Sequence, residues 1–395
     1  MERFAPAKLN LTLDVLGKRP DGYHDLKMVM QSITLGDTLT LEPGGEGVRV
    51  QTDLHFLPTG PKNLAAAAAL RFYETLGRPV PGLEISIRKR IPVCAGMAGG
   101  STDAAAVLRA LNEKEGNPFS MEELARVGEG VGSDVPYCVL GGTALAEGRG
   151  EMLTPLPPLP RCWVAVCKPD FPVSTPELFA RIDGMRVRCR PDTAGLLAAL
   201  AAGDLPGVAR RMYNVFEKVL PERQEVRVAE IKHTLIQCGA LGATMSGTGP
   251  TAFGLFQRKE LAEEACALLS EQNRDTFLAE TVLEGKTLSI LFVEFHSENT
   301  KGMDGVVYGP KNEALGVGAD VRRAVRTGTG GMAGPGAGAA GGPGDPPPCH
   351  RQFRQPGGPG IETGGSGPGP GPRGGAVPGG GRPHGGGGGH PGASA

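Results

Sequence analysis

The segment that most constrains the fold is residues 91–111, IPVCAGMAGGSTDAAAVLRAL. It predicts a strand end, a glycine loop and then a helix, because four apolar residues recur at the spacing of one helical face: Ala104, Val107, Leu108 and Leu111. Glycine permits positive φ and lets a ligand approach the backbone closely. A helix N-terminus offers unpaired N–H donors, so this loop suits a phosphate group. A tight turn that needs small residues only for packing is the simpler alternative.

The glycine loop lacks the lysine of a GxxxxGK[ST] phosphate-binding motif. A nucleotide site here would need its cation and its catalytic acid or base from other segments. Residues 7–15 alternate apolar and polar side chains, which predicts a half-buried strand. The polar face of this strand carries Lys8, Asn10, Thr12 and Asp14, and a solvated face is its simplest interpretation.

Three helix starts stand out from their cap residues. Ser101 or Thr102 lies where an N-cap belongs after the glycine loop. Asp134 precedes Val135-Pro136 and is a plausible N-cap of another helix, with proline in its first turn. Thr175 is expected to cap a helix whose first residue is Pro176.

The remaining segments mix helices and strands along the whole chain, which indicates an α+β or α/β architecture. Further helices are expected at residues 63–76, 121–130, 226–238 and 261–269. Further strands are expected at residues 48–52, 83–88, 141–146, 162–167 and on both sides of a glycine turn within 243–253. The proline-rich connector 156–160 marks a predicted domain boundary.

Composition excludes several classes of protein. The 41 basic and 42 acidic residues give a formal net charge of −1, which argues against a nucleic-acid-binding protein. No window reaches the roughly 18 apolar residues of a membrane span, and the first residues lack a secretory signal. The eight cysteines are scattered, as expected of reduced thiols. We expect a cytoplasmic protein; its oligomeric state is not predicted.

The composition changes sharply towards the C-terminus. Glycine and proline occupy 41 of the 69 positions from Thr327 to Ala395. Such a segment cannot bury enough apolar surface to offset chain entropy, so we expect a disordered tail. Residues 284–326 form a transition of undefined structure, and 284–395 is therefore treated as an uncertain extension.

Three motifs in order resemble those of the GHMP kinases, the superfamily of galactokinase, homoserine kinase and mevalonate kinase. They are PAKLNLTLDVLGKRPDGYHDL from Pro6, PVCAGMAGGSTDAA from Pro92 and MSGTGPTAFGLF from Met245. The resemblance covers about residues 3–282. It implies a two-lobed α+β fold, with a ribosomal-protein-S5-like lobe over residues 1–155 and a ferredoxin-like lobe over residues 156–283.

The resemblance also implies the roles of residues. Lys8 would supply the cation, and Asp134 would accept the proton of the substrate hydroxyl. ATP would lie on the loop residues Pro92, Gly96, Met97, Ala98, Gly99, Gly100, Ser101 and Thr102, with Asn63 near the adenine. Mg²⁺ would bridge the phosphates, and its protein ligands are not defined by the sequence.

A narrower likeness is to the members that phosphorylate the 2-hydroxyl of 4-diphosphocytidyl-2-C-methyl-D-erythritol in the non-mevalonate isoprenoid pathway. It rests on PAKLNL with RPDGYHDL, on GSDVPYCVLGGTALAEGRGE, and on the pair Asn214 and Glu217. The likeness implies that Tyr23 stacks on cytosine, that His24 bonds its edge, and that Phe179 stacks on the opposite face. Asn10 would bond the methylerythritol end.

Two departures and two alternatives qualify this interpretation. The loop reads GMAGG where many relatives have GLGGG, and residues 65–69 are all alanine where relatives often place a basic residue. The first alternative is another GHMP small-molecule kinase, against which the Tyr23-His24 pair argues. The second is a non-catalytic binding module, which would not need Lys8 with Asp134.

Overall fold

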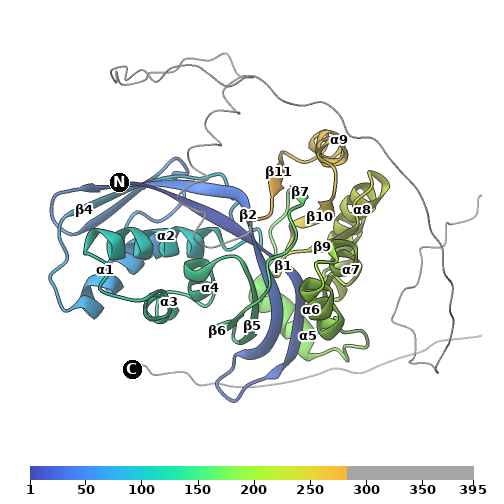
Figure 1. Ribbon diagram of the computed structural model, residues 1–395, viewed down its shortest axis with the longest axis horizontal. Helices are drawn as coiled ribbons and strands as arrows, with labels where there is room; N and C mark the ends of the chain where they lie inside the picture. The colour runs from blue at the N-terminus through green and yellow to red at the C-terminus, as the bar shows by residue number, and fades with distance from the viewer. Residues whose placement is uncertain (283–395) are drawn as a thin grey trace, which may run out of the picture. The chain divides into compact units, whose positions relative to one another are not determined.

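The computed structural model describes residues 1–282 (Figure 1). The predicted extension and tail, 284–395, lie outside the described residues. Two sheets, one of seven strands and one of four, organise this part of the chain, and helices cover both. The α+β prediction is confirmed.

The seven-stranded sheet is built on a long hairpin of β1 (Glu2–Lys18) and β2 (His24–Pro43). Its strand order is β3-β4-β2-β1-β8, while β5 pairs with both β2 and β6. The shorter strands are β3 (Val48–Thr52), β4 (Leu83–Arg88), β5 (Thr143–Gly148), β6 (Met152–Pro155) and β8 (Tyr213–Asn214). Because β8 pairs with β1 in parallel, the second half of the chain completes the edge of this sheet.

The expectation that β1 is half-buried with a solvated polar face is wrong. Lys8, Asn10, Thr12 and Asp14 are all buried, with Asn10 and Thr12 completely inaccessible. A distant segment covers this face, since the Gly247 amide donates to the Asn10 side-chain oxygen, Oδ1. Alternation along one strand shows which residues share a face, but not what later packs on that face.

Helices α1 (Leu64–Leu76), α2 (Gly99–Lys114), α3 (Met121–Glu129) and α4 (Val135–Leu140) lie together beside this sheet (Figure 1). The expected cap at Ser101 or Thr102 is wrong, because α2 begins at Gly99 and its N-cap is Ala98, at φ 58°. The Thr102 hydroxyl is instead buried and donates to the Pro6 carbonyl at 2.6 Å.

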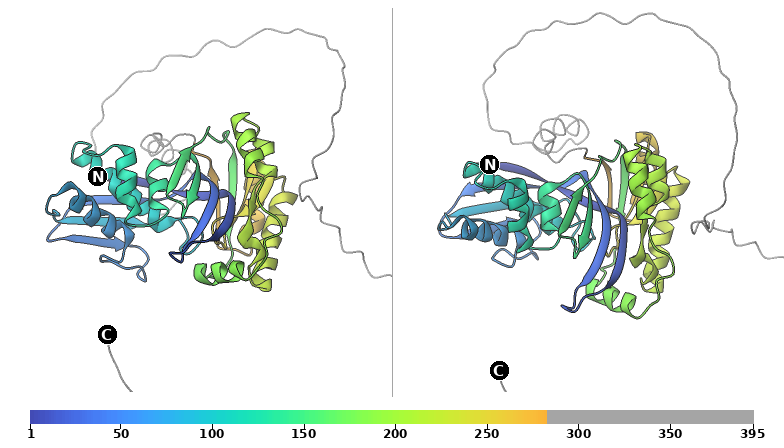
Figure 2. Two further views of the ribbon diagram at one scale, coloured as in Figure 1. Left: turned by 90° about the horizontal axis from the view of Figure 1, so that it is seen from below. Right: turned by 60° about the horizontal axis from the view of Figure 1, so that its bottom comes forward.

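The second half of the described chain forms the four-stranded sheet, in the order β11-β7-β10-β9. Its strands are β7 (Trp163–Lys168), β9 (Gly242–Met245), β10 (Ala252–Phe256) and β11 (Asp275–Glu280). Its helices are α5 (Thr175–Asp183), α6 (Thr193–Ala201), α7 (Leu205–Arg210), α8 (Glu222–Gln237) and α9 (Lys259–Ser270), with a 3₁₀ turn at Val215–Lys218. Figure 2 shows helices of this half gathered on one side of the sheet.

Most of the elements predicted in the second half are present, but several details differ. The expected cap Thr175 is the first residue of α5, and Ser174 precedes it as N-cap. Helices α6 and α7 and strand β11 were not predicted from the sequence. Within residues 1–282, no helix is long and apolar enough to cross a membrane.

Candidate active site

Lys8 and Asp134 face each other across a cavity of about 310 Å³. Lys8 Nζ lies 3.7 Å from Asp134 Oδ2, and it donates to Asn10 Oδ1 at 2.7 Å. The Asp134 side chain makes no capping hydrogen bond although the residue precedes α4. Its carboxylate is therefore available to a ligand in the cavity, and the alternative role as a helix cap is not observed.

The glycine loop lines the same cavity through Cys94, Gly96 and Ala98, all at positive φ. Gly96 cannot be replaced without movement, because a Cβ there would lie 2.2 Å from the Ser246 carbonyl oxygen. This close approach joins the second and third motifs in space.

The other predicted loop residues separate into two groups. Pro92, Gly99, Gly100 and Ser101 are partly or fully accessible along the loop and the start of α2. Met97 is buried in the core, and its carbonyl accepts from the Lys8 amide at 3.3 Å. Because the Thr102 hydroxyl is also buried and bonded, Ser101 carries the partly accessible hydroxyl of this turn, and its Oγ would lie 3.9 Å from a Cβ on Gly132.

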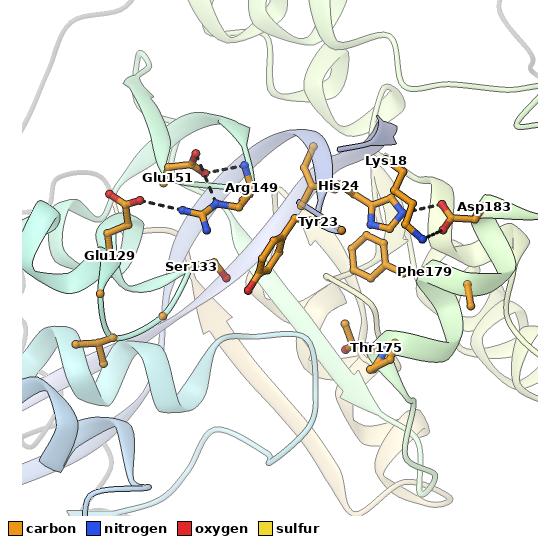
Figure 3. Close-up of a pocket in the computed structure, with 17 residues that line it drawn as sticks. Lys18, Tyr23, His24, Glu129, Ser133, Arg149, Glu151, Thr175, Phe179 and Asp183 are labelled. Carbon is orange, nitrogen blue, oxygen red and sulfur yellow. Dashed lines mark hydrogen bonds and ion pairs between the residues drawn. The ribbon is translucent and has the colours of Figure 1, made fainter. Parts of the chain in front are cut away.

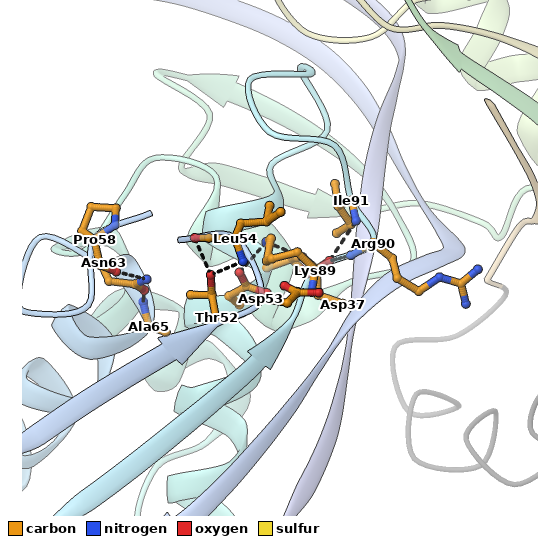
Figure 4. Close-up of polar contacts among 12 residues, drawn as sticks. Asp37, Thr52, Asp53, Leu54, Pro58, Asn63, Ala65, Lys89, Arg90 and Ile91 are labelled. Carbon is orange, nitrogen blue, oxygen red and sulfur yellow. Dashed lines mark hydrogen bonds and ion pairs between the residues drawn. The ribbon is translucent and has the colours of Figure 1, made fainter. Parts of the chain in front are cut away.

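A buried charge cluster holds the start of the glycine loop (Figure 4). Lys89 Nζ donates to Asp37 Oδ2 at 2.5 Å and to Asp103 Oδ2 at 2.7 Å. Asp37 Oδ1 accepts from the amides of Arg90 and Ile91 at 2.6 and 2.8 Å. Burial, reinforced by Asp37, raises the pKa of Asp103 well above its usual value against the pull of Lys89, and Asp103 Oδ1 has no hydrogen-bond partner.

Asn63 caps α1. Its Oδ1 accepts from the Ala65 amide and its Nδ2 donates to the Pro58 carbonyl, both at 2.9 Å (Figure 4). Both ends of the side-chain amide are thus engaged within the protein. The structure gives Asn63 a local structural role, and its predicted approach to adenine stays a prediction.

The third motif forms a glycine turn, residues 246–249, against the first two motifs. Ser246 Oγ donates to the Gly96 carbonyl at 2.9 Å, and the Gly247 amide donates to Asn10 Oδ1 at 2.9 Å. Asn214 Nδ2 donates to the carbonyls of Met245 and Gly247 at 2.8 and 2.7 Å. Asn10 therefore ties β1 to this turn, which argues against the predicted contact between Asn10 and substrate.

A second cleft, of about 690 Å³, holds the predicted aromatic residues (Figure 3). Tyr23 is 58% exposed, and the Arg149 guanidinium lies 5.3 Å from its ring centre. The His24 ring stacks on Phe179 with centroids 4.5 Å apart and an interplanar angle of 26°. The structure brings Tyr23, His24 and Phe179 together, but Phe179 offers one of its faces to His24.

The two cavities share a set of lining residues: Leu26, Ser133, Arg149, Thr175 and Phe179. Arg149 is the charged member of this shared set. It also forms ion pairs with Glu129 at 3.0 Å and Glu151 at 3.9 Å. Sequence reasoning did not single out Arg149, although it lies within the GGTALAEGRGE stretch that carried the resemblance.

Metal-binding side chains do not converge in this region. Within residues 1–282, no group of three or more His, Cys, Asp or Glu side chains is arranged to hold a metal ion.

Comparison with known proteins agrees with this geometry. Residues 63–142 match the family model of the GHMP kinases N terminal domain, and residues 196–275 match that of the GHMP kinases C terminal. The chain is 45% identical over 262 residues to 4-diphosphocytidyl-2-C-methyl-D-erythritol kinase of Lachnoclostridium phytofermentans, covering 66% of this chain and 89% of that protein. It is 46% identical over 255 residues to the enzyme of the same name from Geobacillus thermodenitrificans, covering 64% and 87%.

Solved structures give the same result. A crystal structure of 4-(cytidine 5′-diphospho)-2C-methyl-D-erythritol kinase matches with a TM-score of 0.60 and 34% identity, covering 71% of this chain and 99% of that one. Homoserine kinase from Cytophaga hutchinsonii matches with a TM-score of 0.56 at 21% identity, covering 72% and 95%, and supports the fold alone. From its sequence identity to these relatives and from the coverage of nearly their full length, the chain belongs to the 4-diphosphocytidyl-2-C-methyl-D-erythritol kinase family of the GHMP kinases.

Proposed function

We propose that this protein transfers the γ-phosphoryl group of ATP to the 2-hydroxyl of 4-diphosphocytidyl-2-C-methyl-D-erythritol, in the synthesis of isoprenoid precursors. The observation that carries the proposal is that two adjacent cavities share five lining residues. One contains Lys8 and Asp134, and the other contains Tyr23, His24 and Phe179. A nucleobase and a reacting hydroxyl at the two ends of one substrate fit this arrangement.

The chemistry follows from the Lys8–Asp134 pair. Asp134 accepts the proton of the 2-hydroxyl while that oxygen forms its bond to the γ-phosphorus and the bond from phosphorus to the ADP oxygen breaks. Lys8 Nζ, 3.7 Å from the Asp134 carboxylate, offsets negative charge that develops on the transferring oxygens. Phosphoryl transfer needs mainly positioning and electrostatic stabilisation, which these two side chains and the loop supply.

The nucleotide phosphates are assigned to the glycine loop and the first turn of α2. Helix α2 runs for 16 residues from Gly99, so its first amides have no intrahelical acceptors. Ser101 Oγ and the Asp134 carboxylate carry oxygen atoms, which are the metal ligands that Mg²⁺ prefers. Residues 1–282 contain no group of three His, Cys, Asp or Glu side chains that could hold a metal ion, so we expect the phosphates to supply most ligands of a Mg²⁺ ion. When bound, the ion would neutralise part of the phosphate charge.

The substrate diphosphate is assigned to the junction of the two cavities. Arg149 is the charged side chain that both cavities share, and a guanidinium suits phosphate oxygens. The cytosine then lies beside Tyr23, His24 and Phe179, and the methylerythritol reaches Lys8 and Asp134.

We further propose that residues 1–155 and 156–283 form two lobes, and that the protein works in the cytoplasm. The position of the site supports the first of these proposals. It draws the glycine loop and Asp134 from one segment, and α5 with the third glycine turn from the other. The proposed partner is a small molecule.

The deciding experiment is ATP turnover by the full chain with the cytidylylated methylerythritol, beside mevalonate and homoserine. Phosphorylation of the cytidylyl compound alone is the expected result. Turnover of mevalonate or homoserine instead would assign another GHMP kinase activity. ATP binding without turnover of any of the three would favour a binding module.

A further inference from the structure

Five residues of helix α5 line the 690 Å³ cleft, and Thr175, Phe179 and Asp183 are the polar or aromatic ones among them. Their spacing of four residues places them on one helical face. Phe179 stacks on His24 and Thr175 lines both cavities, whereas Asp183 lines the 690 Å³ cleft as its acidic residue on this helix. It is also the last residue of the helix.

Asp183 contacts both strands of the β1–β2 hairpin beside its turn (Figure 3). One carboxylate oxygen, Oδ1, bonds His24 Nε2 at 2.6 Å, and the other, Oδ2, accepts from Lys18 Nζ at 3.1 Å. Lys18 and His24 are cross-strand partners, at the end of β1 and the start of β2. A single carboxylate from the second half of the chain therefore holds the hairpin end that carries Tyr23.

These contacts leave His24 little freedom. Its side chain is 8% exposed, with one ring face against Phe179 and Nε2 against Asp183. The bond from His24, followed by that from Lys18, lowers the pKa of Asp183, so the carboxylate is ionised and acts only as an acceptor. Nε2 must then carry the proton, and in the neutral imidazole Nδ1 is left as an acceptor.

We propose that Asp183 is a positioning residue that fixes His24 with Nδ1 as an acceptor, so that the cleft selects a nucleobase that presents an amine. This inference rests on the proposed function and names what sets its base specificity. Cytosine carries an amino donor where uracil carries a carbonyl acceptor. His24 Nδ1, as an acceptor, can form a hydrogen bond with the amino group of cytosine, whereas it would face a second acceptor on uracil. A site built on such a hydrogen bond discriminates more strongly than an apolar pocket does.

The test compares three variants of the full chain: Asp183→Ala, Asp183→Asn and the control Asp25→Ala. Asp25 follows His24 in β2 but pairs with Arg19 rather than with His24. The asparagine variant keeps an oxygen that can accept the Nε2 proton. Steady-state kinetics would be measured with the cytidylyl substrate, with its uridylyl analogue and with varied ATP. The His24 tautomer would be read from ¹⁵N-histidine NMR at pH 8, assigned with a His24→Gln variant.

Asp183→Ala is expected to raise KM for the cytidylyl substrate roughly tenfold, the scale of one charge-assisted hydrogen bond, and to leave KM for ATP unchanged. Its preference for cytidylyl over uridylyl substrate should fall by a similar factor, with His24 shifting to a mixture of tautomers. Asp183→Asn should recover most of the preference, and Asp25→Ala should match the wild type.

Two results would overturn the inference. One is a His24 tautomer that does not change in Asp183→Ala. The other is a base preference that stays constant while KM for both substrates and thermal stability change together, since that pattern describes a structural role alone. Because the tautomer is read without catalysis, wild-type inactivity towards the cytidylyl substrate would count against the proposed function and not against the His24–Asp183 relationship.

Discussion

Lys8 Nζ lies 3.7 Å from Asp134 Oδ2, which is too far for a hydrogen bond and close enough for strong attraction between ions. The two partners differ in access, because the Lys8 side chain is 5% exposed and that of Asp134 is 29% exposed. The ammonium is thus fixed inside the protein by its bond to Asn10, while the carboxylate opens to the cavity. This asymmetry suits a fixed cation that supports a proton acceptor.

Asp134→Asn should lower turnover by roughly 10²–10⁴, the usual contribution of a general base, because an amide cannot take the hydroxyl proton. Nucleotide binding should persist, since the loop and α2 are untouched. The measurements are ATP turnover and the shift of thermal unfolding temperature by ATP. Asp170→Asn, at an exposed position that is not among the residues lining the cavity, is the matched control. Turnover near the wild-type rate would remove Asp134 from the role of base.

Asn10→Ala should destabilise the protein by about 1–3 kcal/mol, because it leaves the Gly247 amide and the Lys8 ammonium without their shared acceptor. Denaturant unfolding measures this change. A contact with substrate alone would give a different pattern, with KM raised and the free energy of unfolding unchanged. That second pattern would restore the role that the sequence suggested for Asn10.

The sequence predicted best those features that depend on residues close together in the chain. The strand at residues 7–15, the glycine loop with its helix, and the turn between β9 and β10 all follow from local period and glycine position. Lys8, Tyr23 and His24 were predicted as site residues from the first motif, and Asp134 from the stretch GSDVPYCVLGGTALAEGRGE, because each of these stretches is itself a local pattern. The boundary of α2 was displaced because Ala98, and not a polar side chain, adopts the cap position.

The features that the sequence did not predict join residues from distant segments. Asp37 meets Lys89, Asp183 meets His24, and Arg149 meets Tyr23, and in each pair the partners lie far apart along the chain. No period or spacing relates such residues. In the sequence, Asp37, Lys89, Asp183 and Arg149 appear only as charged residues. Charged residues are far more often exposed to solvent than buried, so nothing marked these four as members of a buried contact or a site.

Arg149→Leu should raise KM for the cytidylyl substrate roughly ten- to a hundredfold with little change in kcat, because a diphosphate at the cavity junction would lose its cation. The wild-type KM should rise with salt, and that of the variant should depend on salt less. Arg161→Leu removes another partly paired arginine, 71% exposed at its side chain, and serves as the control. An unchanged KM would place the diphosphate elsewhere.

The buried cluster under the glycine loop predicts a pH dependence of stability. The folded-state pKa of Asp103 is raised, so the native protein holds a proton that the unfolded chain releases, and this contribution to stability is lost as pH rises from about 4 through the raised pKa. Asp103→Asn removes the titration. The free energy of unfolding of the variant, measured with denaturant, should therefore increase relative to that of the wild type as pH rises from 5 to 8. A constant difference across this range would mean that Asp103 is ionised throughout.

Cys94 offers a chemical probe of the cavity. Among the cysteines of residues 1–282 it is the exposed one, and it lines the 310 Å³ cavity with Lys8 and Asp134. A bound nucleotide on the glycine loop would cover its sulfur. N-ethylmaleimide should therefore inactivate the enzyme, and ATP should slow this loss at least tenfold, with Cys94→Ala resistant to the reagent. Peptide mass spectrometry would confirm the site of modification. If ATP binds but does not slow modification of Cys94, the phosphates do not lie on this loop, and the assignment of Gly96 to Ser101 to the nucleotide is wrong.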